Sequence, residues 1–113
     1  MPRNMSFMLT TRQVQEETKT HTIRDGWWDL KKGEILNAVK QCQGLKKGEK
    51  IVRLKLIRVV STRESMLINV TPELCVMEGF PELTPVEFAD FFIHHNRKAG
   101  LTTPLNFIRF EYV

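Results

Sequence analysis

Lys19, Thr22 and Arg24 are the residues in this sequence whose types and spacing could together do chemistry. From Lys19 to Arg24 the residues alternate as in a β-strand, so Thr22 and Arg24 should share one face. Lys19 can join them only if it lies on a turn or helix end before the strand, or if a bulge intervenes. Such a cluster could hold an anion, or could activate the hydroxyl as a nucleophile. The simpler alternative is an edge strand with solvated polar side chains.

The length and composition indicate one small domain with a single core, since 42% of the 113 residues are hydrophobic. We expect an N-terminal tail over residues 1–5 and one domain over residues 6–113. No apolar run approaches the length of a membrane span and no signal-peptide pattern is present, so we expect no membrane partner. Cys42 and Cys75 form no CxxC pair, which favours a cytoplasmic protein with free thiols. We expect no metal, no cofactor and no obligatory protein partner.

The net charge of +4 hides an asymmetry along the chain. Residues 1–63 contain 14 Lys and Arg against 6 Asp and Glu, whereas residues 64–113 contain 3 against 7. A basic half beside an acidic half predicts a surface for a polyanion, most simply nucleic acid. A solvated lysine-rich surface is the alternative.

Two lysine-rich turns are the candidate phosphate contacts. The pentapeptide Leu-Lys-Lys-Gly-Glu occurs at Leu30–Glu34 and again at Leu45–Glu49, each time before a predicted strand. A polar turn whose glycine has positive φ explains the repeat about as well as a phosphate path does. If nucleic acid binds, the contacting residues should be Lys31, Lys32, Lys46 and Lys47.

Trp27 and Trp28 follow a predicted turn at Asp25-Gly26. One of two adjacent tryptophans usually enters the core, while the other covers an edge or meets a ligand. The exposed ring could stack on a base, with simple packing as the alternative.

Glu78 is placed by a helix that the sequence marks at both ends. Thr71 is a typical N-cap with Pro72 in the first helical position, and Gly79 suits the position just past the helix end. Glu78 therefore lies at the negative end of the helix dipole, where a carboxylate is disfavoured and where burial would raise its pKa. An exposed glutamate is the alternative, because such residues are tolerated at helix ends.

A second helix is predicted from Thr84, which forms a capping box with Glu87 and precedes an aromatic stripe. We expect this stripe to pack on the core and not to bind a cofactor. Its members follow the spacing i, i+3, i+4, i+7 and are Phe88, Phe91, Phe92 and His95.

The rest of the chain predicts the fold class. In the strand predicted at Ile51–Ser61, the apolar residues switch from one face to the other part-way along. This switch predicts a bulge near Leu56–Arg58. Thr10 and Gln13 fit a capping box for a short helix that delivers the chain to Lys19. The sum is a mainly β, α+β fold: a small, closed, mostly antiparallel β-barrel with short flanking helices. The further strands are predicted at Ser6–Leu9, Ile35–Lys40, Ile51–Ser61 and Leu105–Val113.

Three pieces of the sequence together resemble the ASCH family, a branch of the PUA-like β-barrels. The resemblance runs from about Phe7 to Val113, and its first half looks like short ASCH proteins of bacteria and their prophages. The family usually has Gly two residues before the signature lysine, where this chain has Glu17. The departure adds a negative charge and concerns the turn that presents the lysine. The three pieces are Lys19-x-x-Thr22-x-Arg24, Glu78-Gly79-Phe80 before the helix with Glu87-Phe88, and Ile108-Arg109-Phe110-Glu111-Tyr112.

The resemblance implies two kinds of function. The family's barrels are regarded as RNA-binding, and some small members are amidohydrolases that remove the acetyl group from the exocyclic amine of acetylated cytidine. That activity is attributed to a Lys, a Thr and a Glu, which correspond here to Lys19, Thr22 and Glu78. Thr22 would be the nucleophile, Lys19 its base and Glu78 the acid. The substrate-binding residues would be Arg24, Trp27 and Trp28.

We therefore expect an amidohydrolase that removes an acyl group from a modified cytosine nucleoside or nucleotide. The alternative is a non-catalytic module that binds RNA or a modified base through the same cleft and the basic half. A ribonuclease comes third, because the sequence has no evident His pair or carboxylate cluster for metal-assisted cleavage. The expected partner is a modified nucleoside, RNA, or both.

Overall fold

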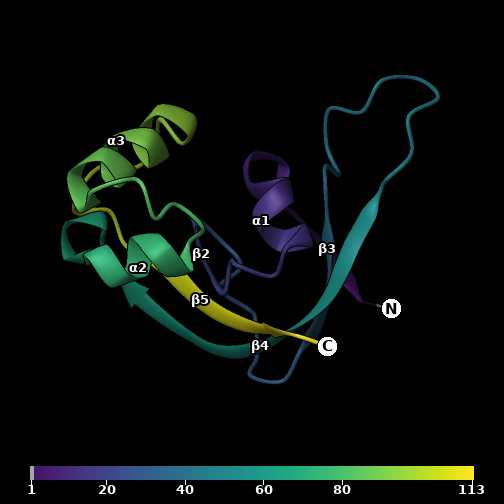
Figure 1. Ribbon diagram of the computed structural model, residues 1–113, viewed down its shortest axis with the longest axis horizontal. Helices are drawn as coiled ribbons and strands as arrows, with labels where there is room; N and C mark the ends of the chain where they lie inside the picture. Colours follow the sequence, from purple (N-terminus) through teal and green to yellow (C-terminus); the bar gives the residue numbers. More distant parts are fainter. Residues whose placement is uncertain (1) are drawn as a thin grey trace.

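The computed structural model describes residues 2–113 and shows a strongly curled five-stranded sheet with short helices on its concave side (Figure 1). The order in the sheet is β1-β3-β4-β5-β2, and neighbouring strands are antiparallel except for β1 and β3. No helix in this part of the chain is long and apolar enough to cross a membrane. The strands are β1 (Arg3–Ser6), β2 (His21–Arg24), β3 (Ile35–Val39), β4 (Arg53–Ser65) and β5 (Leu105–Tyr112).

The predicted fold class is confirmed, but the predicted closure of the barrel is wrong. β1 and β2 are the two edges of the sheet, and within residues 2–113 no strand pairing joins them. Each edge strand has four residues. The sheet is therefore a half-barrel with an open seam, and the Arg24 side chain spans this seam to reach the Ser6 carbonyl.

The N-terminus differs from the prediction. The strand lies at Arg3–Ser6 and not at Ser6–Leu9, so the sheet begins within the segment assigned to a tail. Met5 and Phe7 are the buried apolar residues, whereas Met8 and Leu9 are half exposed on a 3-10 turn, Met8–Thr10 (η1). The apolar pattern places the strand three residues too late, because four apolar residues, Met5, Phe7, Met8 and Leu9, follow one another closely there.

The long strand β4 carries the predicted register change at two positions, on either side of Leu56–Arg58. Against β3 the register shifts between Ala38 and Val39, and against β5 it shifts between Val59 and Ser61. Such irregularities increase the local twist and bend the strand. They allow one strand to follow the whole curve of the sheet (Figure 1).

The helices are α1 (Thr11–Gln15), α2 (Pro72–Met77) and α3 (Pro85–His95), with a second 3-10 turn, η2, at Leu67–Asn69. The capping box at the start of α3 is confirmed, as is the N-cap of α2. The one predicted for α1 does not form, because the Thr10 side chain makes no cap bond. The Gln13 amide instead donates to the Gly79 carbonyl at 3.1 Å and ties α1 to the end of α2.

The end of α2 is held by Gly79, as the sequence predicts. The Gly79 N–H bonds to the Val76 carbonyl at 3.0 Å and the Phe80 N–H bonds to the Cys75 carbonyl at 2.9 Å, which is the Schellman pattern. Gly79 has φ +93°, and a Cβ there would lie 2.8 Å from Cγ of Gln13. The glycine therefore serves both the turn and the close approach of α1, and this approach sets the position of Glu78.

Gly79→Ala should destabilise the protein more than Gly48→Ala, which provides a matched control. Gly48 has φ +88° but open space around the position of a Cβ. We expect Gly48→Ala to cost about 1–2 kcal/mol from the left-handed backbone alone. Gly79→Ala should cost about 1–3 kcal/mol more, because the methyl group overlaps Gln13. Urea unfolding of the two variants measures the difference, and equal losses would contradict the packing argument.

Candidate functional site

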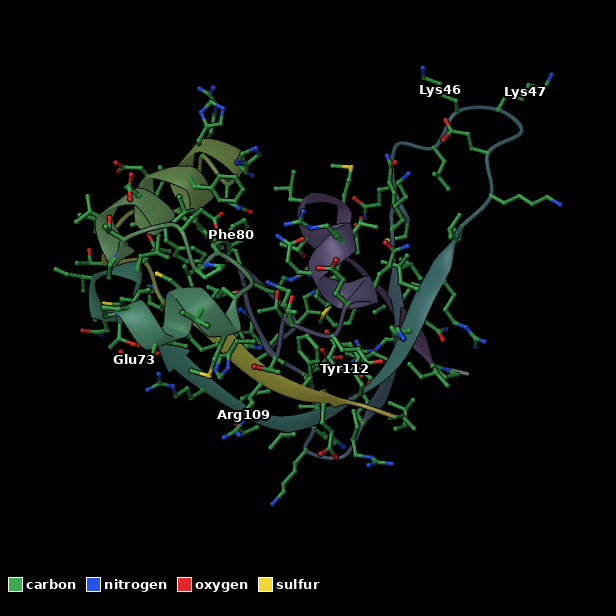
Figure 2. The ribbon with its side chains drawn as sticks, in the orientation of Figure 1. Lys46, Lys47, Glu73, Phe80, Arg109 and Tyr112 are labelled. Carbon is green, nitrogen blue, oxygen red and sulfur yellow. The ribbon has the colours of Figure 1, made fainter. Side chains whose placement is uncertain are left out.

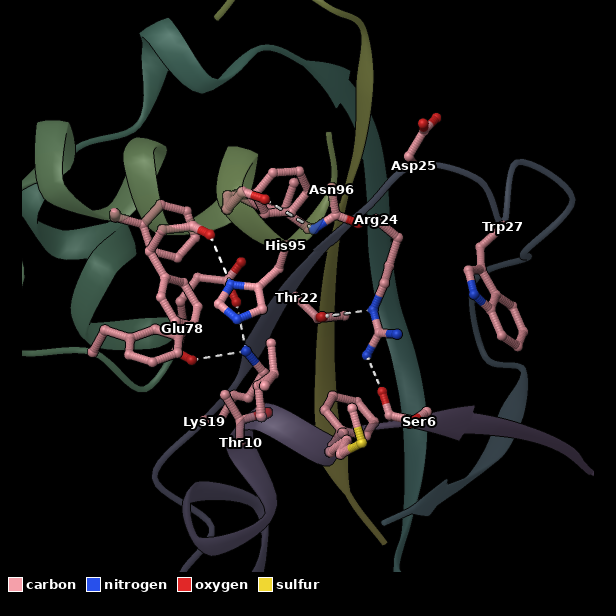
Figure 3. A pocket seen from close by; sticks show the side chains of 18 residues that line it. Ser6, Thr10, Lys19, Thr22, Arg24, Asp25, Trp27, Glu78, His95 and Asn96 are labelled. Atoms are coloured by element: carbon pink, nitrogen blue, oxygen red, sulfur yellow. Dashed lines mark hydrogen bonds and ion pairs between the residues drawn. The ribbon is translucent and has the colours of Figure 1, made fainter. Parts of the chain in front are cut away.

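A cavity of about 380 Å³ lies at the open seam of the half-barrel (Figure 3). One wall comes from the end of β1 and η1, another from β2, and the third from the end of α2 and from α3. The structure brings five of the predicted site residues into its lining, from segments far apart in the sequence. They are Lys19, Thr22, Arg24, Trp27 and Glu78.

Lys19 reaches the cavity because the chain turns sharply between α1 and β2. Glu17 has φ +59°, a left-handed conformation that glycine adopts without strain. Glycine, the residue expected here from the resemblance to ASCH proteins, would suit this conformation. The turn forms here with a glutamate, whose carboxylate is bound by Lys55 at 2.9 Å. The Tyr112 hydroxyl then donates to the Lys19 carbonyl and fixes the backbone at the start of β2.

Lys19 and Glu78 form a buried ion pair in the wall of the cavity. The Lys19 Nζ lies 2.6 Å from Oε2 of Glu78 and 2.7 Å from the Glu78 carbonyl oxygen, and the two side chains are only 4% and 3% exposed. Burial lowers the pKa of Lys19, against the attraction of Glu78, while the charge of Arg24 lowers it further. Burial likewise raises the pKa of Glu78, opposed by Lys19. Both shifts favour the neutral amine and the protonated acid.

Thr22 and Arg24 share a face of β2, as the strand alternation predicts. The Arg24 Nε donates to Oγ1 of Thr22 at 3.0 Å, which leaves the hydroxyl proton of Thr22 free for another acceptor. Nη2 of Arg24 donates to the Ser6 carbonyl at 2.6 Å, and the guanidinium lies over the Phe7 ring at 4.9 Å. Burial lowers the pKa of Arg24 to about 10, so the group stays charged at neutral pH.

The polar residues of the cluster line one cavity, but the proposed base and nucleophile are not hydrogen-bonded to each other. Within residues 2–113 no hydrogen bond joins the Lys19 amine to the Thr22 hydroxyl, although both line the same cavity. The amine is held by Glu78 and the hydroxyl by Arg24. A ligand between them, or a shift of the Lys19 side chain, is needed to connect the two groups.

An aromatic wall opposite Arg24 is the part of the site that sequence reasoning missed. Phe88 and Phe92 pack in the core as predicted, but they also line the cavity, together with Phe80, Phe91 and His95. The ring centroids of Phe80 and Phe91 are 5.0 Å apart, and those of Phe91 and His95 are 4.5 Å apart. The histidine at the end of the aromatic stripe could have indicated that this side of α3 lines a cavity, because a polar ring rarely belongs to an apolar core.

The two tryptophans separate as predicted, one half-buried and one exposed. Trp27 packs beside the core, lines the cavity and lies under the Arg3 guanidinium at 5.0 Å. Trp28 is 53% exposed and is not part of the cavity lining. Only Trp27 is therefore placed to contact a ligand in this cavity.

The two lysine-rich turns have one geometry and two different locations. In each turn a Glu N–H bonds to the first Lys carbonyl at 3.0 Å, and Gly33 and Gly48 both have φ +88°. Leu30–Glu34 precedes β3, whereas Leu45–Glu49 lies on the long loop after it, so they occupy opposite ends of this strand. Figure 2 shows Lys46 and Lys47 at the tip of that loop, away from the body of the protein. None of the four lysines lines the cavity.

The described residues contain no group of three or more His, Cys, Asp and Glu side chains that could hold a metal ion. The cluster of Lys19, Thr22, Arg24 and Glu78 offers one carboxylate, and that carboxylate is already bound by an amine. An amine, a hydroxyl, a guanidinium and a carboxyl group are the side-chain types that acid–base and nucleophilic chemistry uses.

The curled sheet with helices on its concave side is a small PUA-like α+β fold. No family model and no curated protein matches the chain. A crystal structure of a protein from Enterococcus faecalis, of the family model DUF984, has a TM-score of 0.68 at 19% identity, covering 100% of this chain and 76% of that one. An ASCH domain from Lactobacillus crispatus has a TM-score of 0.67 at 12% identity, covering 97% of this chain and 78% of that one. The chain therefore has an ASCH-like fold.

Removing both partners of the buried pair should cost less than the two single removals added together. Lys19→Met and Glu78→Met each leave a charged or polar group without its partner in a dry site, at an expected cost of about 3–5 kcal/mol. The double variant should cost clearly less than the sum of the single losses, since no uncompensated charge remains. Urea unfolding of the four proteins at neutral pH measures this coupling. Additive losses would show that the two side chains do not stabilise each other.

Proposed function

We propose that the protein is an amidohydrolase that removes an acyl group from the exocyclic amine of a modified cytosine nucleoside or nucleotide. The observation that supports this most is the buried Lys19–Glu78 pair, 2.6 Å apart, in the same cavity as the Thr22 hydroxyl. Acyl transfer needs a nucleophile, a base to take its proton and an acid to protonate the leaving amine. The likeness of fold to an ASCH domain is consistent with this choice but does not determine it.

The acylation step uses the pair in its neutral form. Transfer of the shared proton from Lys19 to Glu78 makes the amine a base and the carboxyl group an acid at once. The Thr22 oxygen then attacks the acyl carbon while its proton moves to Lys19. The bond between the acyl carbon and the exocyclic nitrogen breaks, and Glu78 donates its proton to that nitrogen. An acylated Thr22, a protonated Lys19 and an ionised Glu78 remain, with the deacylated cytosine nucleoside or nucleotide as the first product.

The deacylation step returns the protein to its starting state. Ionised Glu78 takes a proton from a water molecule, whose oxygen attacks the acyl carbon of the ester. The bond to the Thr22 oxygen breaks, and protonated Lys19 gives that oxygen its proton. A carboxylic acid leaves, and the pair again holds one exchangeable proton. Arg24 supports both steps by fixing Oγ1 of Thr22 with its Nε donor.

A second candidate function is a non-catalytic module that binds a modified base or RNA in the same cavity. The observation in its favour is that Lys19 bonds to Glu78 and not to Thr22. In that case the pair is structural, and the aromatic wall with Trp27 binds the base. Incubation of the protein with acetylated cytidine, followed by ultraviolet absorbance, separates the two functions.

Thr22→Ala should abolish deacylation, while Thr22→Ser should retain part of it because the hydroxyl group remains. Thr20→Ala is the matched control, since Thr20 lies two residues away and outside the cavity lining. We expect a loss of several orders of magnitude for Thr22→Ala and little change for Thr20→Ala. The measurement is kcat/KM for acetylated cytidine, with circular dichroism as a check on folding. Equal activity of Thr22→Ala and the wild type would exclude Thr22 as the nucleophile.

The rate should depend on pH as a bell. The active pair holds one proton, so at low pH protonation of Lys19 removes the base, and at high pH loss of the Glu78 proton removes the acid. Burial lowers the pKa of Lys19 and raises that of Glu78, so both limbs should lie between the ordinary values of these groups. The two apparent pKa values belong to the pair and not to single residues. A kcat/KM that keeps rising up to the ordinary pKa of lysine would contradict this assignment.

A further inference from the structure

Arg24 is a charged group that forms no ion pair within residues 2–113. Its guanidinium bonds to a hydroxyl, a backbone carbonyl and an aromatic face, and among the ion pairs within residues 2–113 none includes it. Nη1 of Arg24 forms no hydrogen bond in this part of the chain. The neighbouring carboxylate of Asp25 points away from it (Figure 3). A cation that is partly removed from water and contacts no carboxylate is well suited to bind an anionic group of a ligand.

A second cavity adjoins the first across this same side chain. It has a volume of about 360 Å³ and shares Ser6, Met8, Arg24 and Trp27 with the first cavity. The rest of its lining is rich in amides, which donate and accept hydrogen bonds as sugar hydroxyls require. These further lining residues are Asn4, Gln41, Cys42 and Gln43.

The two cavities differ in the chemistry that they suit. The first has the aromatic wall of Phe80, Phe91 and His95, which suits a flat base, together with the acid–base pair. The second has amides and the unpaired guanidinium, which suit hydroxyls and an anion. A nucleotide has a flat base, a sugar ring with hydroxyl groups and an anionic phosphate, joined in that order. The base would therefore fit the first cavity, and the sugar and phosphate would fit the second.

We propose that the second cavity binds the sugar and phosphate of a nucleotide, with the Arg24 guanidinium as the partner of the phosphate. The protein then prefers a nucleotide unit to a free nucleoside. This rests on the proposed function, because the cytosine base must occupy the first cavity. The phosphate can belong to a mononucleotide or to the phosphodiester of an RNA strand, since both present the same anionic oxygens to Arg24.

Binding of cytidine and of its 5′- and 3′-monophosphates, measured by titration calorimetry, tests the phosphate contact without any turnover. At least one monophosphate should bind tenfold tighter than cytidine or better, which corresponds to about 1.4 kcal/mol. Arg24→Gln should remove this gain. Because Arg24 also joins β1 to β2, the Arg24→Gln variant could fail to fold, and a second variant on the surface tests the same contact. Gln43→Glu adds a negative charge to the second cavity and should reduce the gain, whereas Gln15→Glu, the same change on exposed α1, should not.

The two lysine-rich turns distinguish the two sources of phosphate. Only Leu45–Glu49 lies on the loop that begins with the residues lining the second cavity. If the substrate is a strand, a short RNA should bind more tightly than the monophosphates, and Lys46→Gln with Lys47→Gln should weaken it more than Lys31→Gln with Lys32→Gln. Affinity for the RNA should also fall with added salt. If the two double variants weaken RNA binding equally, and the monophosphate binds both of them as it binds the wild type, the phosphate belongs to a mononucleotide.

The outcomes separate this proposal from the proposed activity. Equal binding of cytidine and both monophosphates, no binding of any of them, or a gain that survives both Arg24→Gln and Gln43→Glu, would overturn the phosphate subsite. If acetylated cytidine is hydrolysed while the monophosphate brings no gain, the amidohydrolase stands and the subsite fails. If no acylated cytidine or nucleotide is hydrolysed but the gain depends on Arg24, the subsite stands and the activity fails.

Discussion

The buried pair of Lys19 and Glu78 is the interaction on which the rest of the site depends. Two ionisable groups are removed from water, and they are tolerated because the amine binds both the carboxylate and the carbonyl of one residue. The surrounding fold serves this contact. Gly79 lets the end of α2 approach α1, and the left-handed turn at Glu17 with the Tyr112 bond sets the backbone of Lys19. Burial then lowers the pKa of Lys19 and raises that of Glu78, and both shifts favour the neutral pair that the proposed acyl transfer would use.

The open seam of the sheet gives this pair access to a ligand. A closed barrel would join β1 to β2 by backbone hydrogen bonds and would leave no room for a cavity between them. Here the Arg24 side chain spans the gap and lines one cavity on each side. The same residue therefore holds the edges of the sheet together, orients the Thr22 hydroxyl and remains unpaired towards a ligand.

The sequence predicted local features well and distant arrangement poorly. Caps and helix ends at Thr71, Gly79 and Thr84 follow from local hydrogen bonding, and the structure has all three. The position of Lys19 beside Glu78 could be expected only through the likeness to ASCH proteins, since no local rule relates residues 59 positions apart. Likewise, periodicity assigned the whole aromatic stripe of α3 to the core. Whether its edge faces a cavity depends on how the sheet curls, which a sequence pattern does not contain.

The central claim is that Lys19 acts as a base and not as a fixed positive charge. The most direct test is the rate of acetylcytidine deacylation by Lys19→Arg, in protein whose melting temperature shows that it is folded. Guanidinium can still bind the Glu78 carboxylate but cannot give up its proton at the pH of the assay. The account predicts a loss of several orders of magnitude in kcat/KM. A rate close to that of the wild type would contradict it and would assign Lys19 a purely electrostatic role.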